Sequence, residues 1–227
     1  MNSDPSLAQQ LSDYKAGFVQ RAAPERVATM ETATANLKAA GIEANALKVG
    51  ETVPDVDLTD ATGKAVSLSQ FWNKGPLVVI FYRGGWCPYC NLELRAWQKH
   101  LGDLADLGAS LVAISPQTPD NSLTTSQKNE LSFAVLSDSK LEAARAFRIA
   151  FEMPPELIEI YSKAGNDLSV VNGNGRWVLP LPATYVIDQS GKVIYNHIEA
   201  DYRERAEPAD VLRATSLLRA FICSNKS

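Results

Sequence analysis

The sequence predicts an α/β fold in which a central mixed sheet is flanked by helices. Short apolar runs alternate with segments of helical periodicity, which is typical of parallel strands joined by helices. Two further pairs of apolar runs flank the turn sequences "ATGK" and "DQSGK", which indicates antiparallel hairpins on either side of this unit. The 227 residues are 45% hydrophobic and 21% charged, which is the composition of an ordinary globular protein.

The first 48 residues predict a helical arm. Apolar residues recur at helical spacing from Leu7 to Phe18, and a glycine at position 41 breaks the pattern. Two arrangements stay open for residues 1–48. The arm either covers the core of its own chain or packs on a second subunit, which would make the protein a homodimer. The main domain is then predicted at residues 49–227, with an insertion at about 151–180 that is rich in Gly and Asn.

The main domain is predicted as hairpin, strand, helix, strand, helix, strand, insertion, hairpin and helix. The first hairpin is expected at 54–71 and the last at 183–198. The three central strands are continuous apolar runs, as expected of strands buried on both faces. They lie at 76–83, 109–115 and 133–138. The closing helix is expected at 207–222, because Pro208 suits a first helical turn.

Charge and hydropathy exclude several classes of protein. A net charge of −4 does not indicate a nucleic-acid surface. The longest strongly apolar stretch, "LVVIFY", is far too short to span a bilayer. The first residues, "MNSDPSLAQQ", lack the basic start and apolar run of a secretory signal. We therefore expect a soluble, cytoplasmic protein without a nucleic-acid or membrane partner.

Two of the three cysteines, Cys87 and Cys90, lie two residues apart in the segment "GGWCPYC". A zinc site would need about four ligands at short spacing. The chain offers only His100, His197 and Cys223 besides the pair. Three cysteines are also too few for a disulfide-stapled scaffold. The pair is therefore predicted to carry redox chemistry, which needs no metal and no bound cofactor.

The position of the pair predicts different roles for the two thiols. A strand ends near Arg83, and the two glycines that follow allow a tight turn. Pro88 suits the first turn of a helix. Cys87 is therefore the expected N-cap at the exposed helix start. Cys90 shares the helix face of four mostly apolar neighbours and points inward. These neighbours are Leu94, Trp97, Leu101 and Leu104. Because a helix N-terminus stabilises an anion, Cys87 is predicted as the attacking thiolate and Cys90 as the resolving thiol. In the alternative interpretation both are small apolar residues at a strand–helix junction.

Three other residues have two interpretations each, and the role of a fourth stays open. Arg83 either stabilises the thiolate or forms an ion pair at the surface. Glu93 either moves a proton or lies in solvent on its helix. Pro182 either opens a strand beside the cysteines or ends the inserted loop. Cys223 is a free thiol near the C-terminus whose role the sequence leaves open.

Four segments resemble the peroxiredoxin-like branch of the alkyl hydroperoxide reductase/thiol-specific antioxidant (AhpC/TSA) family. They are "VIFYRGGWCPYCNLELRAW", "LVAISPQ", "PATYVIDQSGKVI" and "DYRERAEPADVL", and the match covers roughly residues 49–222. The resemblance implies a thioredoxin-like fold, in which a central mixed sheet is flanked by helices. It implies a thiol peroxidase that reduces hydrogen peroxide and organic hydroperoxides and is recycled by thioredoxin, a similar dithiol or a small thiol. Cys87 would be the peroxidatic nucleophile, and Cys90 would condense with its sulfenic acid to an internal disulfide. Arg83 would then stabilise the thiolate or the peroxide.

The sequence departs from the family pattern at two positions. Family members place Thr or Ser three residues before the peroxidatic cysteine, where this chain has Gly84. They also place Arg at the opening of the late strand, where this chain has Pro182. Pro182 resembles the cis-proline of thioredoxin-like disulfide reductases, so we expect a cis peptide bond beside the site. A general thiol-disulfide oxidoreductase and a redox-sensing protein without enzyme activity stay as alternatives.

Overall fold

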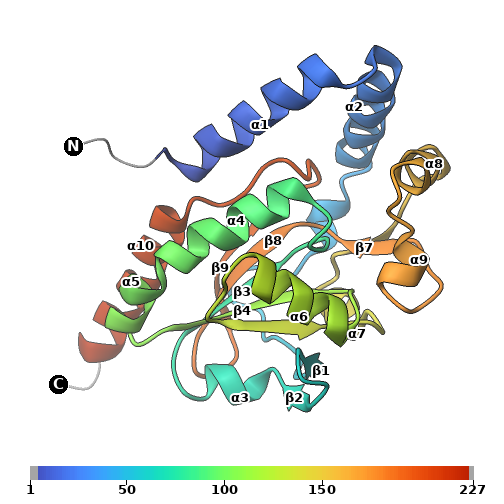
Figure 1. Cartoon of the computed structure of the whole chain (residues 1–227). Helices are drawn as coiled ribbons and strands as arrows, with labels where there is room; N and C mark the ends of the chain where they lie inside the picture. The colour runs from blue at the N-terminus through green and yellow to red at the C-terminus, as the bar shows by residue number, and fades with distance from the viewer. Residues whose placement is uncertain (1–4, 225–227) are drawn as a thin grey trace.

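The computed structural model describes residues 5–224, with side chains as far as residue 218. Its centre is a mixed seven-stranded sheet in the order β2-β1-β5-β4-β3-β8-β9 (Figure 1). The strands are β1 (Asp57–Asp60), β2 (Ala65–Ser67), β3 (Leu77–Phe81), β4 (Ser110–Ser115), β5 (Ala134–Ser137), β8 (Ala183–Ile187) and β9 (Val193–Ile198). The mixed sheet between helices, predicted from the sequence, is confirmed.

The three apolar runs of the sequence form the parallel centre of the sheet. β3 pairs with β4 so that Val79 lies opposite Val112, and β4 pairs in parallel with β5. The hairpins β1–β2 and β8–β9 are antiparallel, as predicted. β8 adds to β3 in the antiparallel direction, with Tyr185 opposite Val79. The turn that follows β3 therefore lies at the carboxyl end of a fully buried strand.

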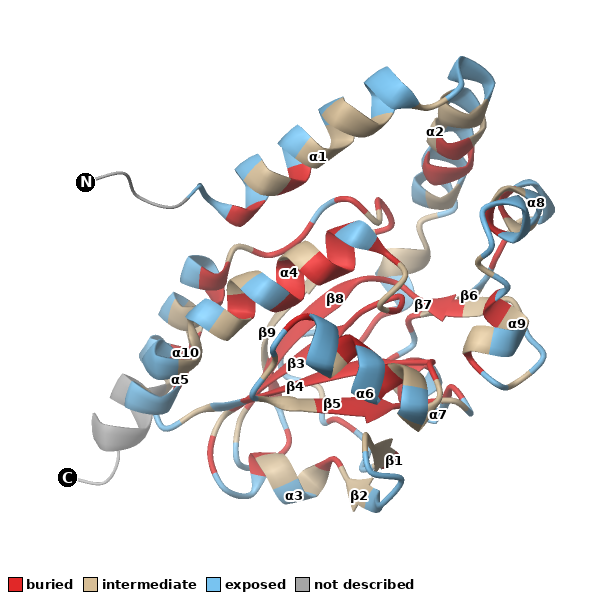
Figure 2. Cartoon of the chain, viewed as in Figure 1, coloured by how far each residue is buried: buried red, intermediate tan, exposed pale blue. Residues whose placement is uncertain are grey.

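Alternate side chains of β3 enter two separate apolar clusters, because successive residues of a strand point to opposite faces. Val78 and Ile80 join the cluster of α4 (Pro88–Lys99), α5 (Leu101–Asp106) and α10 (Pro208–Ser224). Val79 and Phe81 join the cluster of α3 (Ser69–Trp72) and α7 (Glu142–Ala146). α6 (Pro119–Lys128) packs on β5, with Ser122 Oγ 2.8 Å from Ser137 Oγ. Figure 2 shows the central strands buried between these helices.

The helix that follows the cysteine pair is shorter than the apolar spacing predicts. α4 ends at Lys99 and α5 begins at Leu101, because His100 leaves the helical region with φ −103° and ψ 11°. The His100 ring nitrogen Nδ1 lies 2.7 Å from Asp103 Oδ2, a local bond at this break. The apolar face continues across the break, since Trp97 and Leu104 are both buried.

The N-terminal arm lies against its own chain. α1 (Leu7–Arg21) packs along α4, and α2 (Pro24–Ala39) lies beside α8 (Pro155–Lys163) (Figure 1). A short 3₁₀ helix, η1 (Ile42–Asn45), leads from α2 to the main sheet. The Glu207 carboxylate accepts the N–H groups of Leu7 and Ala8 at the start of α1. The arm thus covers the core of its own chain. Contact of the arm with a second subunit and the boundary at residue 48 both stay predictions.

The segment predicted as an insertion folds into two helices and a small second sheet. β6 (Ala150–Glu152) pairs antiparallel with β7 (Val178–Pro180). Between them lie α8 (Pro155–Lys163) and α9 (Leu168–Val171). A third apolar cluster joins α2 to α8 and includes Met30 and Tyr161. Among the described residues, none of the helices is both long enough and apolar enough to cross a bilayer.

Candidate active site

A tight glycine turn places the first cysteine at the start of α4. Gly84 has φ +143°, and an added Cβ would lie 2.4 Å from the Trp86 indole nitrogen. A Cβ on Gly85 would lie 2.2 Å from Thr125 Oγ1. The Cys87 N–H donates to the Gly84 carbonyl at 3.0 Å and closes the turn. Both glycines are therefore required where the chain passes from the strand into the helix.

Side chains from α4 and from the segments on either side of α6 hold this turn. The Gly85 N–H donates to Gln117 Oε1 at 2.8 Å, and Asn91 Nδ2 donates to the Gly85 carbonyl at 2.8 Å. Asn129 Nδ2 in turn donates to Asn91 Oδ1 at 3.0 Å. Because Gln117, Asn91 and Asn129 are buried, these bonds fix the glycine turn rigidly against α4 and α6.

Cys87 is the N-cap residue of α4, as predicted, but the expectation of an exposed thiol is wrong. Only 1% of the residue is exposed. α1 and α2 contribute Tyr14, Phe18 and Met30 to the walls around it, and the sequence pattern of α4 alone could not show this cover. Burial by itself would raise the pKa of the Cys87 thiol. The hydrogen bond from Cys90 and the positive charges of nearby guanidinium groups outweigh burial and lower this pKa to about 6.

Cys90 points inward, as predicted, and is fully buried. Burial is the main cause that raises the pKa of its thiol well above the ordinary value, and the neighbouring Cys87 raises it further. Both thiols are free. The two cysteines thus differ in acidity in the direction that the sequence predicts. Cys87 has the lower pKa and is the thiol that forms a thiolate more readily.

A buried ion pair behind Cys90 was missed by the sequence analysis. Arg205, from the loop between β9 and α10, places Nη2 3.3 Å from Cys90 Sγ and Nε 2.5 Å from Glu93 Oε2. Glu93 is fully buried, so its interpretation as a solvated helix residue is wrong. Burial raises the pKa of Glu93 to about 7, although the Arg205 charge opposes the shift. The charged run "DYRERAEP" was the only sequence signal for Arg205.

Arg83 is buried beside the cysteines, so its alternative as a surface ion pair is wrong. Its guanidinium carbon lies 4.4 Å from the Tyr202 ring centroid and 5.0 Å from that of Trp86. Its Nη2 donates to the Tyr161 hydroxyl at 2.7 Å. Its Nε has no hydrogen-bond partner among the described residues. The aromatic rings therefore hold a cation against the thiol while one N–H donor stays available.

The peptide bond before Pro182 is trans, because the described residues contain no cis peptide bond. The expectation of a cis-proline is therefore wrong. The Leu181 N–H donates to the Ile149 carbonyl, so the chain runs directly from the small sheet into β8. The chain makes no tight turn at this point. Outside tight turns the trans isomer of a peptide bond before proline is the more stable one. Pro182 still lines a small cavity together with Arg83 and Tyr202.

A cavity of about 160 Å³ lies beside Cys87. Its walls come from α1, α2, α8, the start of α4 and the loop before α10. The lining residues are Tyr14, Phe18, Arg26, Met30, Arg83, Trp86, Cys87, Pro88, Tyr89, Tyr161, Asn166 and Tyr202. Tyr89 packs edge-on between Tyr14 and Tyr202, with centroid distances of 5.0 Å and 5.6 Å. The arm thus forms part of the site.

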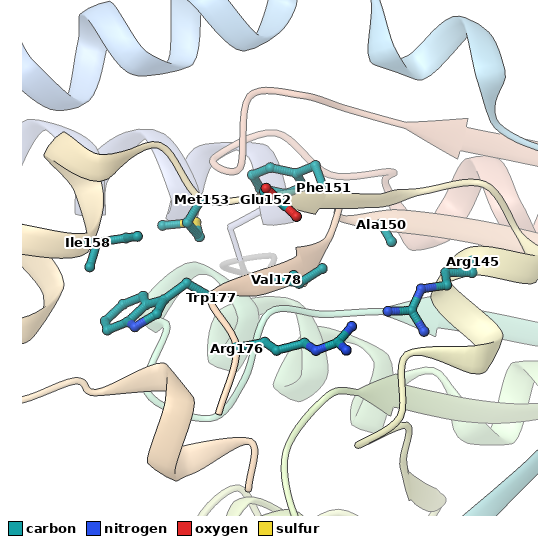
Figure 3. Close-up of a pocket in the computed structure, with 9 residues that line it drawn as sticks. All are labelled: Arg145, Ala150, Phe151, Glu152, Met153, Ile158, Arg176, Trp177 and Val178. Atoms are coloured by element: carbon teal, nitrogen blue, oxygen red, sulfur yellow. The ribbon is translucent and has the colours of Figure 1, made fainter. Parts of the chain in front are cut away.

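A larger cavity of about 540 Å³ lies between the small sheet and α8 (Figure 3). Phe151 and Trp177 line it, and the side chains of Arg145 and Arg176 reach its other side. It contains no thiol, so the redox chemistry belongs to the smaller cavity. The described residues hold no group of three or more His, Cys, Asp or Glu side chains placed to bind a metal ion. Cys223 lies outside the described side chains.

Known proteins are similar to about two thirds of this chain. The family model of the AhpC/TSA family matches residues 49–196. Chloroplastic peroxiredoxin Q of Populus jackii is 30% identical over 150 residues, which cover 65% of this chain and 60% of that protein. The thiol-disulfide oxidoreductase ResA of Bacillus cereus is 26% identical over 148 residues, which cover 65% of this chain and 68% of that protein.

Solved structures confirm the predicted fold class. The crystal structure of peroxidoxin BcpB from Mycobacterium tuberculosis superposes with a TM-score of 0.58 at 24% identity. The superposition covers 76% of this chain and 97% of that chain. At this identity the likeness shows the fold, a thioredoxin-like sheet flanked by helices. The arm, residues 1–48, lies before the segment that the family model matches.

Proposed function

Because the chain belongs to the AhpC/TSA family, we propose that it is a thiol peroxidase that reduces hydrogen peroxide and organic hydroperoxides through Cys87 and Cys90. One observation carries the proposal. The Cys87 thiol lies at a helix start near the Arg83 and Arg205 guanidinium groups and has a pKa of about 6. Most of it is therefore thiolate at neutral pH, and the thiolate is the nucleophile.

In the first step the Cys87 thiolate attacks the terminal oxygen of the hydroperoxide. The S–O bond forms, the O–O bond breaks, and the leaving oxygen takes a proton from solvent and departs as water or an alcohol. Cys87 becomes a sulfenic acid. Arg83 stabilises the negative charge that develops on the peroxide oxygens, since its buried Nε is a donor without a partner among the described residues.

In the second step Cys90 attacks the sulfenic sulfur of Cys87, a disulfide forms, and water leaves. Cys90 must lose its proton first, although burial disfavours its thiolate. The Arg205 guanidinium, 3.3 Å from Cys90 Sγ, stabilises the thiolate that forms. Glu93, with a pKa of about 7 and a buried Oε1 without a partner among the described residues, accepts the proton.

An external dithiol then reduces the disulfide and restores both thiols. The family resemblance points to thioredoxin or a similar dithiol. We place the cycle in the cytoplasm because dithiols are kept reduced there. A second candidate function, a general thiol-disulfide oxidoreductase, is favoured by the Cys-Pro-Tyr-Cys segment and by the likeness to ResA. The 1% exposure of Cys87 opposes it, because a protein disulfide would have to reach a covered sulfur.

The decisive experiment is mass spectrometry of the cysteine variants after one equivalent of hydrogen peroxide. Cys87→Ser is expected to abolish peroxide consumption. Cys90→Ser is expected to undergo one fast oxidation that leaves Cys87 as sulfenic or sulfinic acid. Loss of the first oxidation in Cys90→Ser alone would show that the two roles are reversed.

A parallel assay separates the candidate functions. Reduction of insulin by the protein without peroxide turnover would favour the general oxidoreductase. Absence of turnover on both substrates would favour a redox-sensing protein, in which the pair switches a contact instead of completing a catalytic cycle.

A further inference from the structure

We propose that the cavity beside Cys87 selects organic hydroperoxides that carry a carboxylate, and that Arg26 of the N-terminal arm binds this carboxylate. The inference rests on the proposed peroxidase function and adds a substrate class to it. Arg26 lies in α2, before the segment that the family model matches. The specificity would therefore belong to the arm of this chain.

The first argument is the size and lining of the cavity. Hydrogen peroxide has two heavy atoms, and a water molecule takes about 30 Å³ in the liquid. The cavity holds about 160 Å³, and aromatic side chains such as Phe18 and Tyr202 form much of its wall. An apolar cavity of about 150 Å³ is large enough to bind benzene. The space therefore fits a hydroperoxide with an apolar body of benzene size.

The second argument is an excess of hydrogen-bond donors. Three of the lining residues carry a buried N–H group without a hydrogen-bond partner among the described residues. These groups are Arg26 Nε, Arg83 Nε and Trp86 Nε1. Buried polar groups are normally paired, so unpaired donors point to a ligand that brings acceptors. No Asp or Glu lines the cavity, so a negatively charged acceptor for these donors would have to come from the ligand.

The two guanidinium groups serve different parts of such a ligand. Arg83 is fixed beside the thiol by the Tyr161 hydroxyl and by the rings around it, so it faces the reacting oxygens. Arg26 comes from another element. Among the described residues it stacks only on Phe18, with its guanidinium carbon 5.6 Å from the ring centroid. An arginine with free donors at the wall of an apolar cavity is suited to a carboxylate.

Three acidic residues lie near Arg26 without pairing with it. Glu25, Glu156 and Glu159 line a second cavity that Arg26 also borders. None of these carboxylates forms an ion pair with Arg26 among the described residues. Their negative charge would weaken the binding of an anion, so Glu156→Gln is expected to raise the preference for a carboxylate.

The kinetic test compares cumene hydroperoxide with its para-carboxylate, two peroxides that share the same reacting group. The readout is the ratio of their kcat/KM values within each variant, so a general loss of activity cancels. The unmodified chain is expected to prefer the carboxylate by about tenfold or more, as a charged hydrogen bond implies. Arg26→Gln is expected to bring the ratio to about one. Arg26→Lys keeps the positive charge and is expected to keep most of the preference for the carboxylate. Arg21→Gln, an exposed arginine in the same arm, is the matched control and is expected to keep the full ratio.

A binding test does not depend on peroxidase activity. The product alcohols, cumyl alcohol and its para-carboxylate, are titrated into Cys87→Ser. The signal is the change in tryptophan fluorescence, to which Trp86 at the cavity wall contributes. The carboxylate is expected to bind more tightly, and adding Arg26→Gln is expected to abolish the difference. Tighter binding of the carboxylate, together with an absence of peroxide turnover in the unmodified chain, would refute the peroxidase function and support the site. Turnover of both peroxides with a ratio near one, or a ratio that Arg26→Gln leaves unchanged, would overturn the inference while the peroxidase function stands.

Discussion

Replacing Arg83 by methionine removes a buried positive charge next to Cys87 and leaves the size of the side chain similar. The Arg83 guanidinium is one of the two charges that lower the pKa of the Cys87 thiol to about 6. A nearby opposite charge shifts a pKa by about 1–3 units, so the pKa in Arg83→Met is expected at about 7 or above. At neutral pH the thiolate fraction would fall from about nine tenths to about half or less.

The assay is the ultraviolet absorbance of the thiolate as a function of pH, in a Cys223→Ser background that removes the third thiol. The unmodified site is expected to show a midpoint near pH 6, and the signal rises with pH because the thiolate is the deprotonated form. The first step of peroxide reduction should follow the same curve. In Arg83→Met the rate of this step is then lower at neutral pH and rises toward the rate of the unmodified protein only above the new pKa. A rate that stays lower there measures the direct contribution of Arg83 to the transition state.

Two variants separate charge from structure. Arg83→Lys keeps the charge and is expected to retain a midpoint within about one unit of the parent. Arg145→Met removes an exposed arginine and is expected to leave the midpoint unchanged. An unchanged midpoint in Arg83→Met would refute the role of the Arg83 charge and would leave the hydrogen bond from Cys90 and the Arg205 charge as the causes of the low pKa.

Two further predictions concern the disulfide and the buried ion pair. Peroxide is expected to form a Cys87–Cys90 bridge within one chain, so non-reducing electrophoresis shows a monomer; a covalent dimer that disappears in Cys223→Ser would contradict this. Glu93→Gln is expected to lower the free energy of unfolding by about 3–5 kcal/mol, because it leaves a buried guanidinium without its counter-charge. Urea unfolding measures this loss against Glu130→Gln, an exposed control, and equal stability of the two variants would show that the ion pair is not stabilising.

The local features of the active site followed from the sequence. Two glycines between an apolar strand and a proline predicted a turn and a helix start, and Cys87 is the N-cap residue. The apolar spacing predicted that Cys90 points inward, and it is fully buried. The strands and hairpins were found in the predicted order as well. These predictions succeed because periodicity and turn chemistry act over a few neighbouring residues.

The surroundings of the thiols were decided by the tertiary structure. Arg83 bonds to a tyrosine 78 residues away, and Glu93 pairs with an arginine 112 residues away. The arm covers Cys87, which the sequence placed at an exposed helix end. A sequence pattern states which residue types are present but not which distant segments meet. Burial and the charges that meet a thiol set its pKa, so the acidity of Cys87 and the shape of its cavity exist only once the arm, the insertion and the loop before α10 pack together.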